Sequence, residues 1–356
     1  MLHVVNGEAT AHAIRTSGVL RPLNPALKES RDPDDVVAWN DVLYEGPVRT
    51  SPSPIMLAHE RSQFIAAQGW EPYITIRQEF GWRDAALAKV KRQDEVVYWF
   101  ESDLGDVLQL AQAIDRLAAR RPESTRFSWI LVDRNPADPA QHGFGDLTTE
   151  QVERLLGARQ PVPEEAWPTA RAFWRAFVSG DPERLMTFLS APSPVPFLDD
   201  GVRRLLAEYP AQRSGLARSE QQILSAITEH SAATPAAVFA QIQQLELRPF
   251  MGDRQVWTRL ERFAKSSPSL IERVDGEPWS SSRVDLMSLD EPDMDAFLAQ
   301  EIRLTDAGHA TLAGEADWLA TGGAGRWIGG YEVPAADRAW RYDEATDRLV
   351  APATGG

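Results

Sequence analysis

The chain has 356 residues, of which 37 are basic and 52 are acidic, so its formal net charge is −15. This excess of negative charge disfavours general binding to nucleic acid, because phosphate contacts need surplus Lys and Arg. The sequence contains no cysteine, which excludes a disulfide scaffold, a thiolate nucleophile and any Cys-ligated metal site.

No apolar run approaches the roughly 18–20 residues that cross a bilayer. The first residues also lack the basic segment and the following apolar segment of a signal peptide. We therefore expect a cytoplasmic protein without membrane contact. Hydrophobic residues make up 43% of the chain, which is enough to build a folded core.

In the first 146 residues, short apolar runs alternate with segments of helical period. Strands are predicted over residues 2–7, 36–39, 95–100 and 127–133. Helices are predicted between them, over residues 10–17, 55–68, 82–92 and 103–119. This alternation predicts an N-terminal α/β domain over residues 1–146, with a mostly parallel, Rossmann-like sheet.

The rest of the chain has a different rhythm. Only helical patterns occur between residues 147 and 212, which predicts a helical connector. Residues 213–326 contain three helical segments, at 219–228, 235–244 and 252–264, and then two strands, at 270–274 and 302–304. This order predicts a winged-helix-like α+β C-terminal domain. Residues 327–356 are predicted to form a C-terminal β-hairpin and a tail.

Three motifs stand out in the first domain. They are His3-Val4-Val5-Asn6-Gly7-Glu8, Trp39-x-Asp41-Val42-Leu43-x-Glu45-Gly46-Pro47, and Val96-Val97-x-Trp99-Phe100-Glu101-x-Asp103-Leu104-x-Asp106. With this set, the chain resembles the bacterial proteins that carry Domain of Unknown Function 1835 at the N-terminus. The segment from Gly252 to Trp257 resembles the C-terminal region that usually accompanies that domain. The third motif of the family often has His where this chain has Ser102.

The resemblance implies no particular reaction, so a function has to be argued from the residues. Each motif follows a predicted strand, and ligands of parallel α/β sheets bind beyond the carboxyl ends of the strands. We therefore expect the three motifs to line one crevice. The candidate catalytic residues are Glu101, Asp103, Asp41 and Glu45. The candidate ligand-binding residues are Asn6, Gly7, Glu8, Thr10 and Arg83.

Carboxylates gathered in one crevice suit two kinds of chemistry. They can hold a divalent metal such as Mg²⁺, which prefers oxygen ligands. They can also act as a general acid and base, because crowding raises the pKa of one of them. The sequence leaves the identity of the metal open.

Each candidate also has a purely structural explanation. Asp103 is a natural N-cap for the helix that follows it. Asp41 and Glu45 can bond the backbone of the turn at Gly46-Pro47, and Asn6 can tie its own loop together. Arg83 lies next to an acidic residue at a helix start. Glu101 is the candidate that capping explains least.

Several enzyme classes lack their fingerprint. The chain has no G-x-x-x-x-G-K-[ST], no G-x-G-x-x-G after a strand, no H-E-x-x-H and no G-x-S-x-G. The leading hypothesis is a small-molecule enzyme or ligand-binding protein that performs metal-assisted hydrolysis or transfer on a small anionic substrate. One alternative is a ligand-sensing transcriptional regulator, and another is a non-catalytic scaffold that contacts a protein partner through its C-terminal domain.

The third helix of the predicted winged helix bears on the regulator hypothesis. It carries Arg254, Arg259, Arg262 and Lys265, but its surroundings are acidic. Its apolar residues Trp257, Leu260 and Phe263 recur every third position, which predicts a buried stripe. We therefore expect this helix to pack within the protein, and we do not expect it to bind nucleic acid.

Overall fold

The computed structural model describes residues 1–20, 36–51, 53–93, 95–118, 121–134, 143–144, 147–229, 233–283, 292–323 and 325–353. Residues 21–35, whose proline, asparagine and charged residues predict a loop, and the domain boundary predicted at residue 146 lie outside these ranges. The described chain divides into two compact units. The first comprises residues 1–44, 74–177 and 187–201, and the second comprises residues 45–73, 178–186 and 202–356. The four-part division at residues 146, 212 and 326 stays a prediction.

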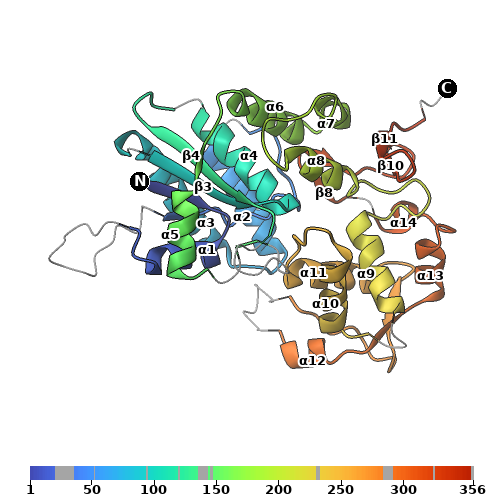
Figure 1. Ribbon diagram of the computed structural model, residues 1–356. Coiled ribbons are helices and arrows are strands. Elements are labelled where there is room, and N and C mark those ends of the chain that lie inside the picture. Colours follow the sequence, from blue (N-terminus) through green and yellow to red (C-terminus); the bar gives the residue numbers. More distant parts are fainter. Residues whose placement is uncertain are drawn as a thin grey trace. The chain divides into compact units, whose positions relative to one another are not determined.

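The first unit is built on one sheet (Figure 1). Its strands are β1 (Leu2–Val5), β2 (Val36–Ala38), β3 (Glu95–Glu101), β4 (Arg126–Val132) and β5 (Gln160–Pro161). Their spatial order is β2-β1-β3-β4-β5. The pairs β1·β2, β1·β3 and β3·β4 are parallel, and β4·β5 is antiparallel. The predicted mostly parallel α/β sheet is thus confirmed. Strand β5 was not predicted, because two exposed residues carry no apolar pattern.

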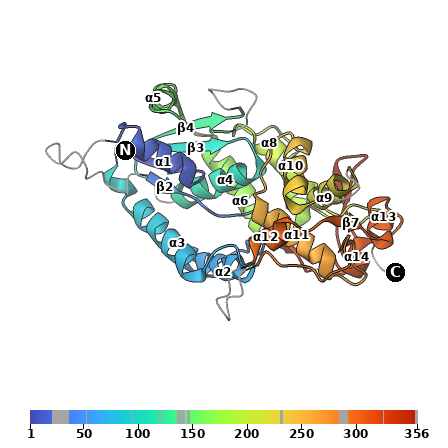
Figure 2. The ribbon, with the colours of Figure 1, turned by 90° about the horizontal axis from the view of Figure 1, so that it is seen from below.

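Helices cover both faces of this sheet, as the two views show (Figures 1 and 2). Helices α1 (Glu8–Thr16) and α5 (Thr149–Gly157) pack on one face, where Val97 and Trp99 of β3 meet Ile14 and Val152. Helices α3 (Tyr73–Ala88), α4 (Leu104–Ala118) and α6 (Ala166–Val178) lie on the other face. Burial on both faces explains why β3 reads as a continuous apolar run.

The chain reverses its direction of winding at β1. It runs from β1 through α1 to β2 on one side of β1, and then returns to place β3 on the other side. The carboxyl ends of β1 and β3 are therefore neighbours at a topological switch point, where open α/β sheets leave a crevice. The register pairs Val5 with Trp99, and the backbone N–H of Asn6 donates to the carbonyl of Trp99 over 3.1 Å.

The second unit contains α2 (Pro54–Ala67) and most of the C-terminal half. Its further helices are α9 (Arg218–Thr228), α10 (Pro235–Leu245), α11 (Asp253–Lys265), α12 (Met294–Leu298), α13 (Asp306–Leu312) and α14 (Trp318–Thr321). Strands β6 (Ile271–Arg273) and β7 (Ile302–Leu304) form an antiparallel pair. Helices α7 (Pro182–Phe188) and α8 (Leu198–Leu206) each contribute residues to both units.

Two details of the helices and strands differ from the sequence predictions. Helix α3 begins at Tyr73, directly after Pro72, and not at Trp82. Where one β-hairpin was predicted after residue 326, the structure has two antiparallel pairs, β8 (Trp327–Ile328) with β9 (Tyr331–Glu332), and β10 (Arg341–Asp343) with β11 (Arg348–Val350). Within the described ranges, no helix is both long and apolar enough to cross a membrane.

Helix α11 packs much as its spacing predicted. Leu260 and Phe263 are completely buried. Trp257 is half-buried, and its ring lies 5.3 Å from that of Phe297. The same buried face also holds Arg259, one of the four basic residues that the sequence places on this helix.

Candidate functional site

Asn6 and Glu101 meet at the switch point. The side-chain Nδ2 of Asn6, directly after β1, donates to Oε1 of Glu101 at the end of β3 over 3.0 Å. The same oxygen accepts the backbone N–H of Phe144 over 2.9 Å. On the other side of Asn6, the hydroxyl of Thr10 donates to Oδ1 over 2.8 Å. Both functional atoms of the Asn6 amide are therefore engaged, and they hold the Glu101 carboxylate in place.

Two more carboxylates stand at the start of α4. Oδ1 of Asp103 accepts the backbone N–H of Asp106 over 3.1 Å, which is the geometry of an N-cap. Oδ2 of Asp106 accepts the backbone N–H of Glu101 over 2.5 Å. The structural explanation of Asp103 as a cap therefore holds, and the cap belongs to a larger group. We call Asn6, Glu101, Asp103 and Asp106 the switch-point cluster.

The three carboxylates of this cluster are crowded. Glu101, Asp103 and Asp106 each offer one oxygen, and these three oxygens lie within 4.8 Å of one another. Burial, and then the charge of Glu101, raise the pKa of Asp103 to about 7. Burial and the charges of Asp103 and Glu101 hold the pKa of Asp106 well above its usual range. A cation placed among these oxygens would relieve both penalties.

The loop at residues 143–144 closes tightly on the cluster. Gly143 has a φ of +75°, and a Cβ atom built on it would lie 1.9 Å from Oε2 of Glu101. A side chain cannot occupy that position without moving the carboxylate. The next residue, Phe144, is fully buried, with its ring 6.0 Å from that of Trp99. The loop is thus anchored in the core and holds its backbone against Glu101.

Asp106 and Gly143 were not among the predicted site residues. Asp106 lies in the third motif, but an acid in the first turn of a helix is ordinarily explained by the helix dipole. Its burial, which is what makes it unusual, depends on the packing of α4 on the sheet. No local signal marks Gly143, because its role is a close approach to a residue that is 42 positions away in the chain.

Other predicted ligand-binding residues lie in a neighbouring part of the first unit. Glu8 and Arg83 line a pocket of about 640 Å³ beside β2, together with Asn40, Glu79 and Trp82. Gly7 is the N-cap of α1, so the helix begins before Thr10, which was the predicted start. At Gly7 the backbone is extended, and a Cβ atom would make only an ordinary contact.

Arg83 is deeply buried in that region. Its guanidinium carbon lies 4.7 Å from the ring centre of Trp39 and 4.3 Å from that of Phe80. Burial and the charge of Arg116 lower its pKa to about 10, while Asp41 and Asp84 act in the opposite direction. The predicted residue Asp41 is itself buried. Its carbonyl accepts the amide of Gln109 over 3.0 Å.

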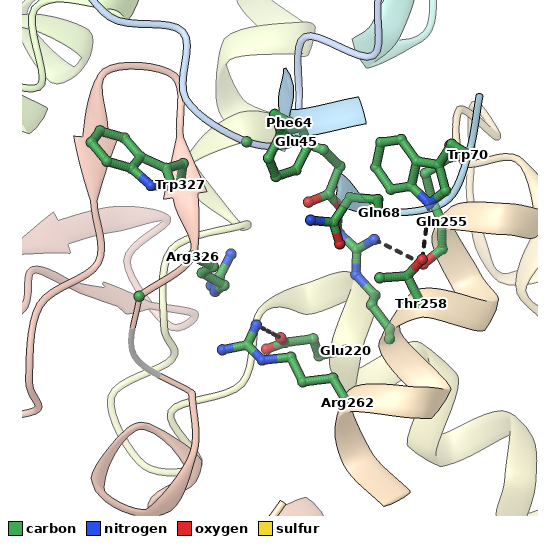
Figure 3. A pocket seen from close by; sticks show the side chains of 13 residues that line it. Glu45, Phe64, Gln68, Trp70, Glu220, Gln255, Thr258, Arg262, Arg326 and Trp327 are labelled. Atoms are coloured by element: carbon green, nitrogen blue, oxygen red, sulfur yellow. Dashed lines mark hydrogen bonds and ion pairs between the residues drawn. The ribbon is translucent and has the colours of Figure 1, made fainter. Parts of the chain in front are cut away.

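Glu45 belongs to the second unit, where its carboxylate pairs with Arg259. It lines a pocket of about 250 Å³ that also contains Arg262, Arg326 and Trp70 (Figure 3). Burial raises the pKa of Glu45, and the charge of Arg259 opposes this rise. The structure thus brings Asn6, Thr10, Glu101 and Asp103 together, while Glu45 takes part in a different arrangement.

Comparisons with known proteins identify no family for this chain. No protein-family model matches the chain, and no curated protein matches it either. The resemblance to proteins with Domain of Unknown Function 1835 therefore stays a prediction from the three sequence motifs.

Proposed function

We propose that the protein binds a divalent cation through the carboxylates of Glu101, Asp103 and Asp106. The observation that carries this proposal is that each residue offers an oxygen, with all three oxygens within 4.8 Å of one another. Their position at the switch point of a parallel sheet supports it, since ligands of such folds bind there. The side chain of Asn6 serves as a positioning group for Glu101.

The chemistry of these ligands favours Mg²⁺ or Mn²⁺. Such ions take carboxylate oxygens and keep several waters, so that part of the coordination shell can be exchanged for substrate oxygens. When bound, the cation would polarise an anionic substrate or activate a water molecule. We therefore propose metal-assisted hydrolysis or group transfer on a small anionic substrate.

The pocket beside β2 supports the substrate class. Glu8, which lines it, is the first residue of α1 and lies only two residues after Asn6. The N-terminus of α1 offers backbone N–H groups to an anion. Arg83, which also lines the pocket, contributes a buried positive charge. A ligand in this pocket would therefore lie near the first motif and beside the positive charge of Arg83.

We also propose that α9, α10, α11, β6 and β7 form a winged-helix-like arrangement that serves in packing or protein contact. The order of three helices and an antiparallel pair supports it. The four basic residues of α11 all have acidic partners, with Arg254 near Glu71, Arg259 near Glu45, Arg262 near Glu220 and Lys265 near Glu261. This pairing disfavours the DNA-binding regulator. A cytoplasmic location stays a prediction from the sequence.

Calorimetric titration with MgCl₂ and MnCl₂ tests the cation proposal. We expect saturable binding to the wild-type protein and its loss in Glu101→Gln, because glutamine keeps the shape but is a far weaker metal ligand. The matched control is Glu153→Gln, an exposed acid on α5, which should bind like the wild type. Absence of saturable binding by the wild type, or equal binding by Glu101→Gln, would contradict the proposal.

A further inference from the structure

The pocket around Glu45 is a second candidate site, and none of the functions proposed above uses it. It lies within the second unit and has a volume of about 250 Å³. Helix α11, the C-terminal turn of α2 and the segment before β8 supply its walls. We call it the arginine pocket, after Arg259, Arg262 and Arg326. Figure 3 shows Gln68 and Glu45 on one side of the opening, Arg262 and Glu220 opposite them, and Arg326 between the two sides.

Protein groups hold the three guanidinium groups of the arginine pocket in place. Arg259 pairs with Glu45 and lies 3.6 Å from Glu208. Arg262 lies 3.7 Å from Glu220 and donates to the carbonyl of Gly322 over 3.1 Å. Such support fixes donors before a ligand arrives, which lowers the entropy cost of binding.

Arg326 differs from the other two arginines. Its guanidinium donates to the backbone carbonyl of Glu208, and among the described residues it forms no ion pair. It is half-buried, so one end of the side chain is anchored while the group still borders the pocket. Its charge interacts with Glu208 and Glu45 at longer range, but its direct hydrogen bond is to a neutral carbonyl, which neutralises less of its charge than an ion pair would.

The charges lining the pocket favour an anionic ligand. Three arginines face two glutamates, Glu45 and Glu220. Burial raises the pKa of Glu45, and the charge of Arg259 opposes this rise. The other main acid nearby, Glu208, has a pKa of about 2, because Arg204, Arg259 and Arg326 outweigh the effect of its burial. It therefore stays ionised, and it takes up part of the charge of Arg259.

Aromatic rings complete the lining. Phe64, Trp70 and Trp327 lie around the arginines. The indole N–H of Trp70 donates to the hydroxyl of Thr258 over 2.9 Å, so the ring is fixed. Guanidinium groups match the geometry of phosphate oxygens, and a dianion suits more than one guanidinium. The volume is small for a ligand site, which restricts the organic part of a ligand to a few atoms.

We infer that the arginine pocket binds a small ligand through a doubly charged oxyanion, either inorganic phosphate or a compact phosphate monoester. The inference is independent of the cation proposal, because the two sites share no residue and lie in different units. Loss of one would leave the other untouched, so their failures can be told apart.

Calorimetric titration with inorganic phosphate, at constant ionic strength set with chloride, tests the inference. We expect saturable binding to the wild type, and a rise in Kd of about tenfold or more in Arg326→Gln, which loses one charged hydrogen-bond donor. Arg326→Lys should lose less, because it keeps the charge. The matched control is Arg303→Gln, an exposed arginine on β7 that pairs with Glu272, and it should bind phosphate like the wild type.

Further titrations distinguish inorganic phosphate from a phosphate monoester as the ligand. Tighter binding of glycerol 3-phosphate than of phosphate would assign a phosphate monoester, and equal or weaker binding would assign free phosphate. Acetate, with a single charge, should bind at least about tenfold more weakly than either. Thermal unfolding without ligand shows whether each variant is folded, and Arg262→Gln replaces Arg326→Gln if the latter is not. No saturable phosphate binding by the wild type, or an equal loss in Arg303→Gln, would overturn the inference.

Discussion

The amide of Asn6 donates to the carboxylate of Glu101 over 3.0 Å, although 95 residues separate them in the chain. The contact exists because β1 and β3 are parallel neighbours whose carboxyl ends meet at the switch point. Fixing the orientation of one carboxylate before a ligand binds is a common property of metal sites, where neighbouring hydrogen bonds orient the ligands.

Glu101→Gln should leave the metal-free protein at least as stable as the wild type. A glutamine oxygen can still accept from Asn6 and from the backbone of Phe144, while the repulsion of Asp103 and Asp106 disappears. We expect the free energy of unfolding in urea to be unchanged or to rise by up to about 1 kcal/mol. A fall of roughly 1–3 kcal/mol would instead identify Glu101 as a structural hydrogen-bonding group.

Gly143→Ala should both destabilise the protein and weaken cation binding. The residue has a positive φ, and the new Cβ atom would overlap the Glu101 carboxylate. We expect a loss of roughly 1–3 kcal/mol in the free energy of unfolding. Gly157→Ala is the control, because a Cβ atom there meets nothing within 4 Å, and it should be neutral or slightly stabilising. Equal effects of the two substitutions would show that Gly143 has no special contact.

His3 should make stability depend on pH. Burial, with a smaller effect of the N-terminal charge, lowers its pKa to about 4, whereas the unfolded chain has the ordinary value near 6.5. Between these values the unfolded chain takes up a proton that the folded protein does not. The free energy of unfolding is therefore not reduced by this group above pH 6.5. As the pH falls from 6.5 towards 4, protonation of His3 in the unfolded chain lowers it by up to roughly 3 kcal/mol.

The variant His3→Gln isolates this effect. In the wild type, the indole N–H of Trp99 donates to Nδ1 of His3 over 3.0 Å. The side-chain oxygen of glutamine can accept this hydrogen bond instead, and glutamine does not titrate. The difference in urea midpoint between pH 7 and pH 5 should be smaller in the variant than in the wild type. An identical difference would mean that His3 does not titrate abnormally in the folded protein.

Substituting two arginines of α11, one at a time, distinguishes a packing role of this helix from a DNA-binding role. Arg259→Gln removes the arginine that pairs with Glu45 and one of the cations close to the buried Glu208, and it should cost roughly 3–5 kcal/mol of stability. Arg254→Gln removes an exposed pair with Glu71 and should cost at most about 1 kcal/mol. Urea unfolding measures both. If the wild type bound duplex DNA tightly and Arg254→Gln abolished that binding, the result would instead favour the hypothesis of a transcriptional regulator.

The sequence was sufficient to predict much of the first unit. The apolar run of β3 is continuous because both of its faces are buried, so the run itself signalled a central parallel strand. Asn6 and Glu101 could be placed together because both follow strands of one parallel sheet. By contrast, β5 and the full extent of α3 depend on contacts that no local pattern encodes.

The position of Glu45 shows a second limit of sequence reasoning. It lies four residues after Asp41, so the two seemed to belong to one motif. In the structure the first segment of the first unit ends at Tyr44, and Glu45 begins the second unit. The partner of Glu45 is Arg259, far along the chain. The sequence shows Arg259 only as one of four basic residues on a helix, because nothing local signals that an arginine will be buried against distant acids.

The most direct test of the central claim is anomalous diffraction from crystals soaked in Mn²⁺. We predict one anomalous peak among the carboxylate oxygens of Glu101, Asp103 and Asp106, at about 2.0–2.3 Å from at least two of them, as expected for a small oxygen-ligated dication. Crystals of Glu101→Gln treated in the same way should lack the peak. A fully soaked wild-type crystal with no peak at this cluster, or with its only peak elsewhere, would contradict the assignment.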